Sequence, residues 1–123
     1  MERTILIVDD DPALLELAAA ALEPLGCPVR TAADAASALD ALGDGRPALL
    51  VLDLRLPGMP GLELLERVSR TPSLTGLPVL VVTAWAQREM LDRARALGAA
   101  AVMTKPYSPA ELRDTAAALM DGA

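Results

Sequence analysis

The sequence predicts an α/β domain built on a parallel sheet. Short, unbroken apolar runs recur along the chain, amphipathic stretches of helical period separate them, and polar residues directly follow several of the runs. Unbroken apolar runs are typical of strands that are buried on both faces of a parallel sheet. Strands that alternate with helices indicate a doubly wound architecture, in which helices cover both faces of the sheet.

Three apolar runs are the expected central strands, and two other segments complete the sheet. The central strands are expected at 5–8, 48–52 and 79–82. The more polar segment 29–32 is typical of an edge strand, and 99–103 is the expected fifth strand. For a doubly wound sheet of five parallel strands, we predict the flavodoxin-like order 2-1-3-4-5 with five helices.

The segments between the strands carry apolar residues on one helical stripe, which predicts amphipathic helices. The stripes consist of Leu14, Ala18, Ala21, Leu22 and Leu25; Leu62, Leu65 and Val68; Leu91, Ala94 and Leu97; and Leu112, Ala116 and Leu119. A helix of small residues is expected over 34–42. Asp11 before Pro12 predicts an N-cap followed by a proline at the first helical position. Ser108 and Glu111 have the spacing of a capping box.

The composition is that of one acidic, folded domain covering 1–123. Its 123 residues are 53% hydrophobic, and a net charge of -6 argues against direct binding of nucleic-acid phosphates. One cysteine, Cys27, excludes an intrachain disulfide, and the lack of histidine excludes histidine-based catalysis. The short apolar run near the N-terminus does not predict a signal peptide or a membrane span. We therefore expect a cytoplasmic protein that has no membrane partner.

Polar residues follow the ends of four expected strands. Asp9 and Asp10 follow the first strand, Asp53 the third, Thr83 the fourth and Lys105 the fifth. Parallel strands all point the same way, so these residues are expected at the carboxyl edge of the sheet, where such folds bind ligands. Three carboxylates, a hydroxyl and an ammonium would share one crevice.

The charges of this cluster predict a metal ion. Asp9, Asp10 and Asp53 would repel one another, and Lys105 offsets only part of that repulsion. A hard cation such as Mg²⁺, which prefers oxygen ligands, offsets most of the rest. A carboxylate nucleophile together with a metal, a lysine and a hydroxyl suits phosphoryl chemistry.

Four motifs together resemble the receiver domain of two-component response regulators. They are 5–11 (ILIVDDD), 53–61 (DLRLPGMPG), 83–84 (TA) and 104–107 (TKPY). Each motif alone is moderately specific, whereas all four in this order are strong, and they extend over nearly the whole chain. The resemblance implies a regulatory phosphoacceptor domain rather than an enzyme. Its partners would be a sensor histidine kinase or a histidine phosphotransfer protein, and a downstream protein or an output domain.

The resemblance also assigns roles to site residues. Asp53 would accept the phosphoryl group. Asp10 and Asp53 would bind Mg²⁺ directly, Asp9 would help through water, and the backbone carbonyl of Arg55 would complete the metal site. Thr83 and Lys105 would bind phosphoryl oxygens, and the bond before Pro106 would be cis, a minority state for proline.

Other positions have expected effects on signal lifetime and coupling. In the family, the positions of Arg55 and Trp85 border the path of the attacking water, so we expect a long-lived aspartyl phosphate. Val102 stands where the family usually has a Tyr or Phe switch residue, so coupling to the output surface is expected to differ. Three charges of the winged-helix branch are replaced by Ala100, Ala101 and Thr115. A monomer or a weak dimer is therefore expected.

Three other functions remain open at this point. A Mg²⁺-dependent aspartyl-phosphate phosphatase usually has a carboxylate two residues after its nucleophile, where this chain has Arg55. A flavin or nucleotide binder would need a glycine-rich loop after the first strand, where the sequence is VDDDP. A degenerate, interaction-only receiver would not need the acidic cluster, Thr83 and Lys105.

Overall fold

One sheet of five parallel strands organises the protein, as predicted. The computed structural model describes residues 3–84 and 87–121. The strands lie in the predicted order β2-β1-β3-β4-β5. They are β1 (Ile5–Val8), β2 (Val29–Ala32), β3 (Leu49–Leu52), β4 (Val79–Thr83) and β5 (Ala101–Thr104). β5 begins two residues later than predicted, because the N–H of Ala99 still donates to the carbonyl of Ala94 in the preceding helix.

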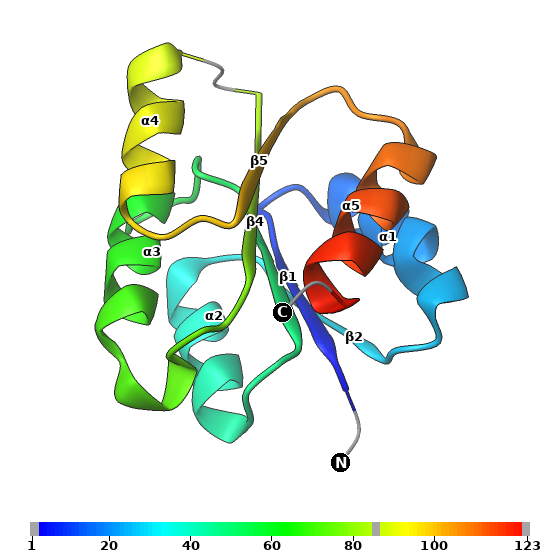
Figure 1. The fold of residues 1–123 in the computed structure, drawn as a ribbon, viewed down its shortest axis with the longest axis horizontal. Helices are drawn as coiled ribbons and strands as arrows, with labels where there is room; N and C mark the ends of the chain where they lie inside the picture. The colour runs from blue at the N-terminus through cyan, green and yellow to red at the C-terminus, as the bar shows by residue number, and fades with distance from the viewer. Residues whose placement is uncertain (1–2, 85–86, 122–123) are drawn as a thin grey trace.

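Five α-helices cover the two faces of this sheet (Figure 1). They are α1 (Pro12–Leu22), α2 (Ala35–Asp44), α3 (Gly61–Arg70), α4 (Arg88–Ala96) and α5 (Pro109–Asp121). α2, α3 and α4 lie on one face, and α1 and α5 pack side by side on the other. Two 3-10 turns that the sequence did not predict, η1 (Glu23–Leu25) and η2 (Pro72–Leu74), follow α1 and α3. Among the described residues, no helix is long and apolar enough to cross a membrane.

Local hydrogen bonds set the starts of α1 and α5 as predicted. The Asp11 carboxylate accepts from the backbone N–H of Ala13 at 2.9 Å, and Pro12 is the first residue of α1. The Ser108 hydroxyl accepts from the N–H of Glu111 at 3.0 Å, and the Glu111 carboxylate accepts from the N–H of Ser108 at 3.2 Å. These caps end the loops that follow β1 and β5, which carry residues of the predicted site.

The central strands are buried by helices on both faces. Every residue of β1 and β3 is at most 4% exposed. Alternate residues of each strand join one of two apolar layers, so that Leu6 and Val8 face α2 and α3, whereas Ile5 and Ile7 face α1 and α5. Burial on both faces fixes the register of the strands, and hence the place where each one ends.

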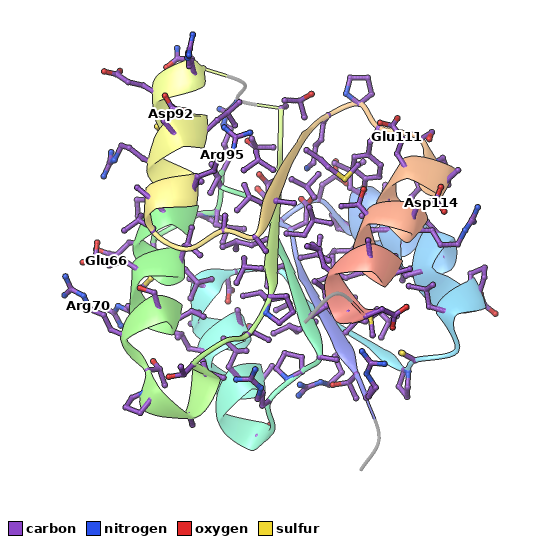
Figure 2. The ribbon with its side chains drawn as sticks, viewed as in Figure 1. Glu66, Arg70, Asp92, Arg95, Glu111 and Asp114 are labelled. Atoms are coloured by element: carbon purple, nitrogen blue, oxygen red, sulfur yellow. The ribbon has the colours of Figure 1, made fainter. Side chains whose placement is uncertain are left out.

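The outer faces of the helices carry charged pairs that are open to water. Glu66 and Arg70 on α3 approach to 2.9 Å, and Asp92 and Arg95 on α4 approach to 3.7 Å (Figure 2). Exposed pairs of this kind contribute little to stability, because water and salt screen them.

Arginines bind helix ends at the amino edge of the sheet, opposite the predicted site. Arg30 of β2 donates to the carbonyls of Ala41 and Gly45 at the end of α2, both at 3.0 Å. Arg46 donates to the carbonyl of Thr75 beyond η2 at 2.8 Å, and Arg3 donates to the carbonyl of Met120 in α5 at 2.8 Å. The last carbonyls of a helix lack intrahelical donors and carry partial negative charge, so cations are favoured there.

Replacing Arg30 should destabilise the fold through the end of α2. We expect Arg30→Met to lower the free energy of unfolding by about 1.5 kcal/mol, because two carbonyls lose a charged donor. Arg70→Met, which removes a surface pair, should change it by less than about 0.5 kcal/mol. Urea unfolding monitored by circular dichroism measures both values, and equal losses in the two variants would contradict the capping role of Arg30.

Candidate functional site

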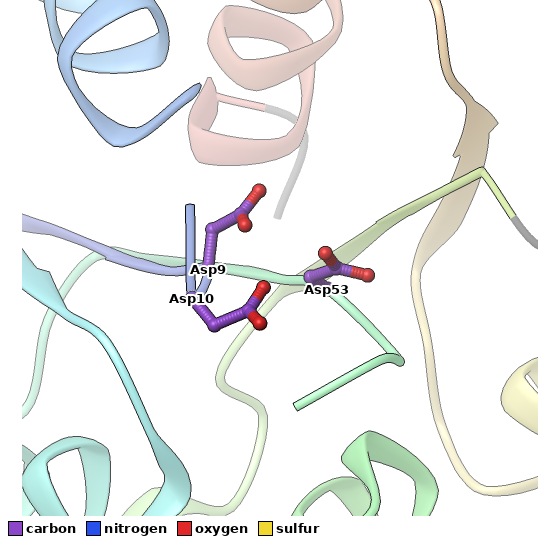
Figure 3. A group of neighbouring side chains, drawn as sticks. All are labelled: Asp9, Asp10 and Asp53. Carbon is purple, nitrogen blue, oxygen red and sulfur yellow. The ribbon is translucent and has the colours of Figure 1, made fainter. Parts of the chain in front are cut away.

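The carboxyl edge of the sheet gathers the predicted acidic residues. Asp9 and Asp10 follow β1, and Asp53 follows β3, which pairs directly with β1. Figure 3 shows the three side chains close together at the ends of these two strands. Asp9 and Asp53 are each only 7% exposed, whereas Asp10 is open to solvent. The site is therefore closed on the protein side and reached from the side of Asp10.

The three aspartates have the spacing of a cation site. Each offers one carboxylate oxygen, and these three oxygens all lie within 4.8 Å of one another. A hard divalent cation such as Mg²⁺ prefers carboxylate and carbonyl oxygens and keeps several of its waters. The donor set is made of such oxygens, and the exposure of Asp10 leaves room for water, so the residues fit this metal.

Lys105 lies between the two buried carboxylates. Its ammonium donates to Asp9 Oδ2 at 2.7 Å and to Asp53 Oδ2 at 3.0 Å. Burial alone would lower the pKa of Lys105, but the hydrogen bonds and charges of Asp9 and Asp53 outweigh it, so the pKa is raised above its ordinary value. Lys105 is also the only lysine in the chain. The ammonium therefore stays charged and offsets part of the repulsion within the cluster.

Backbone N–H groups hold the other oxygens of the same carboxylates. Asp9 Oδ1 accepts from the N–H of Asp11 at 3.0 Å, and Asp53 Oδ1 accepts from the N–H of Arg55 at 3.0 Å. Each buried carboxylate thus has one oxygen on the backbone and one on Lys105. This arrangement fixes the rotation of both carboxylate groups.

The last two strands bring Thr83 and Lys105 to the same edge. Thr83 ends β4, is fully buried and pairs in register with Thr104 of β5. The N–H of Lys105 donates to the Thr83 carbonyl at 2.9 Å, which ties the loop after β5 to the end of β4. The peptide bond between Lys105 and Pro106 is cis, as the resemblance implied.

The predicted modulating and switch positions have different surroundings. Arg55 is exposed in the loop that follows β3, next to Asp53. Val102 is half-buried in β5 and packs against the apolar layer beneath α4, to which Met90 and Leu97 also contribute. Trp85 lies outside the described residues.

Two features beside the site were not predicted from the sequence. An apolar groove of about 460 Å³ runs between α1 and the loop that contains Lys105 and Tyr107. Leu17 lines this groove. This leucine is 65% exposed, and among the described residues it is the one large hydrophobic residue that is exposed. Burial raises the pKa of Tyr107. Leu17 falls outside the predicted apolar stripe of α1. A leucine on the other side of an amphipathic helix was therefore the sequence signal that could have indicated the groove. The second feature is a close contact of Gly61 with the backbone after β3.

Comparison with known proteins agrees with this geometry. Residues 5–117 match the family model for the response regulator receiver domain. A receiver domain protein (CheY-like) from Methanospirillum hungatei JF-1 superposes with a TM-score of 0.91 at 33% identity, covering 99% of this chain and 96% of that one. Sporulation initiation phosphotransferase F of Bacillus subtilis is 33% identical over 114 residues, which are 93% of this chain and 90% of that protein.

Some relatives are longer than the chain. Phosphate regulon transcriptional regulatory protein PhoB of Pseudomonas aeruginosa is 36% identical over 110 residues, which are 89% of this chain but 48% of that protein. The chain thus spans about half the length of this relative. Because the family model covers nearly all of the sequence and the strand order and site geometry agree with it, the chain belongs to the response regulator receiver domain family.

Proposed function

We propose that the chain accepts a phosphoryl group on Asp53 in a Mg²⁺-dependent reaction. The observation that carries the proposal is the setting of the Asp53 carboxylate, which is buried, oriented by Arg55 N–H and Lys105, and close to two further carboxylates. A carboxylate so placed is a fixed nucleophile beside a site for a metal. The donor would be a sensor histidine kinase or a histidine phosphotransfer protein, and the domain would work in the cytoplasm as a monomer or a weak dimer.

The residues of the site have distinct roles in this transfer. An oxygen of Asp53 attacks the phosphorus of a phosphohistidine, the P–N bond breaks, and the bond electrons return to the imidazole as the acyl phosphate forms. Asp10, Asp53 and the Arg55 carbonyl would hold Mg²⁺, with Asp9 acting through water. When bound, this ion would neutralise charge on the phosphoryl oxygens. Lys105 and Thr83 would bind those oxygens after transfer.

The apolar groove beside Lys105 supports a protein as the phosphodonor. Its lining is continuous with the site through Lys105 and Pro106, and Leu17 stands exposed at its side. A phosphohistidine can reach Asp53 only if its own protein lies against this edge of the sheet. We propose that an apolar helix of the donor occupies the groove, with Leu17 as an anchor. Phosphorylation would then change which partner, or which output domain, the receiver binds.

The competing functions have less support. Arg55 lies where a phosphatase of this chemistry usually has its acid–base carboxylate. A nucleotide binder would have to bring phosphates to three carboxylates without a glycine-rich loop. Labelling with a small phosphodonor separates these cases, because a phosphatase turns the donor over, a nucleotide binder and an interaction-only receiver are not labelled, and a receiver is labelled once.

The decay of that label tests Arg55 and Trp85 as modulators. We expect the label to decay faster in Arg55→Ala and in Trp85→Ala than in the parent.

Asp53→Asn should abolish phosphorylation. The amide retains the shape of the carboxylate but is a far weaker nucleophile, so acetyl phosphate and Mg²⁺ should add one phosphoryl group to the parent and none to the variant. Intact-protein mass spectrometry measures the label. Asp40→Asn, on the exposed side of α2, is the matched control and should be labelled like the parent. Full labelling of Asp53→Asn would overturn the assignment.

Mg²⁺ should bind weakly and depend on the acidic cluster. Few protein ligands replace its waters, so we expect Asp10→Ala to remove binding and Asp9→Ala to weaken it. Asp44→Ala, at the opposite edge of the sheet, should leave binding unchanged. Isothermal titration calorimetry gives the affinity, and unaltered binding in Asp10→Ala would place the metal elsewhere.

Lys105→Ala should impair phosphoryl transfer and lower stability in a pH-dependent way. A raised pKa means that the ammonium stabilises the fold below its unfolded pKa of 10.5, and that this contribution is lost as pH rises through the raised value. The parent should therefore be more stable than the variant near neutral pH, and the difference should shrink in strong alkali. Urea unfolding across this pH range measures the difference, and Arg67→Ala, at an exposed position of α3, is the control.

Two results would contradict this role for Lys105. A stability difference that does not change with pH would show that the ammonium is not the source. Phosphorylation at the parent's rate in a folded Lys105→Ala would show that the transfer does not need the lysine.

A further inference from the structure

Gly61, the first residue of α3, lies against the backbone that carries Asp53. A Cβ atom built on Gly61 would stand 2.5 Å from the Cα of Leu54, 2.6 Å from the carbonyl oxygen of Asp53 and 2.9 Å from the carbonyl carbon of Leu54. All three are backbone atoms, so no change of side-chain rotamer can relieve the overlap. A larger residue at this position must displace the start of α3 or the segment that begins at Asp53.

The contact is one side of a clamp on the Asp53 backbone. On the other side, the N–H of Asp53 donates to the carbonyl of Val8 in β1 at 3.0 Å. The N–H of Gly61 itself donates to the carbonyl of Leu54 at 2.9 Å. Asp53 and Leu54 are thus held between β1 and α3. The same segment leads to Arg55, whose N–H holds Asp53 Oδ1.

Packing, rather than backbone torsion, explains the glycine. Gly58 has a φ of 80°, a conformation that favours glycine, and a Cβ there would meet nothing within 4 Å. Gly61 belongs to a helix, where alanine is intrinsically favoured over glycine, and its φ lies outside the left-handed range. Its lack of a side chain therefore serves the close approach of α3 to the segment after β3.

We propose that Gly61 is a positioning residue for Asp53. By letting α3 begin in contact with the Asp53–Leu54 peptide, it sets where the Asp53 carboxylate and the Arg55 carbonyl lie relative to Lys105 and the other aspartates. The part of this inference that concerns Mg²⁺ and the phosphoryl group rests on the proposed function. The part that concerns the position of Asp53 holds for the metal-free protein as well.

The test compares Gly61→Ala with two control variants. Gly43→Ala makes the same chemical change in α2, where a Cβ would meet nothing within 4 Å. Val68→Ala truncates a buried residue of α3 that is not part of the site, and so matches a loss of stability. In Gly61→Ala we expect the amide resonances of Asp53 and Arg55 to shift without metal, and the dissociation constant of Mg²⁺ to rise about tenfold. Both controls should retain the parent's resonances at these two residues and its affinity.

Other possible outcomes of these measurements would overturn the proposal. Unshifted Asp53 and Arg55 resonances in Gly61→Ala would overturn it, as would the same changes in Val68→Ala at equal loss of stability. If Gly61→Ala is largely unfolded, the measurements are repeated in trimethylamine oxide, which favours the compact state. Failure to fold there would show a structural role only and would also overturn the proposal. A parent that binds no Mg²⁺ would refute the proposed function, while the metal-free resonances would still test Gly61.

Discussion

The ammonium of Lys105, shared between Asp9 and Asp53, is the interaction on which the rest of the site depends. Two carboxylates that are almost fully buried, side by side, repel each other and lose hydration, so each needs a compensating partner. Lys105, which follows the end of β5, supplies it through hydrogen bonds of 2.7 Å to Asp9 and 3.0 Å to Asp53. Backbone N–H groups hold the remaining oxygens. The sheet thus brings residues 9, 53 and 105 together, and the ammonium can offset part of the carboxylate charge only when all three strands end where they do.

The fold and most of the site could be predicted because they follow from patterns along the chain. Apolar runs and helical stripes indicated the sheet order, and polar residues after strands indicated Asp9, Asp10, Asp53, Thr83 and Lys105. The contact of Gly61 could not be predicted, since the approach of α3 to the segment after β3 is a matter of tertiary packing that the motif at 53–61 does not reveal. The bonds of Arg30 to α2 escaped prediction for the same reason, because the two partners meet only when α2 packs against β2.

The two edges of the sheet carry side chains of opposite charge. In a doubly wound fold, helix amino ends lie near the carboxyl ends of the strands, and helix carboxyl ends lie at the other edge. The aspartates lie at the first edge, and Arg3, Arg30 and Arg46 bind helix-end carbonyls at the second. The negative site therefore lies near the positive ends of the helix dipoles, and the arginines lie near their negative ends.

The use of a single lysine has a chemical consequence. Every other basic side chain is an arginine, and guanidinium groups do not react as amines do. Acylating or alkylating reagents that select side-chain amines therefore have one target in this chain, the group that bridges Asp9 and Asp53. Attaching the protein to a support through this lysine would therefore modify the site itself, and not a residue remote from it. Conversely, protection of Lys105 from such a reagent would report directly on whether the two carboxylates still hold it.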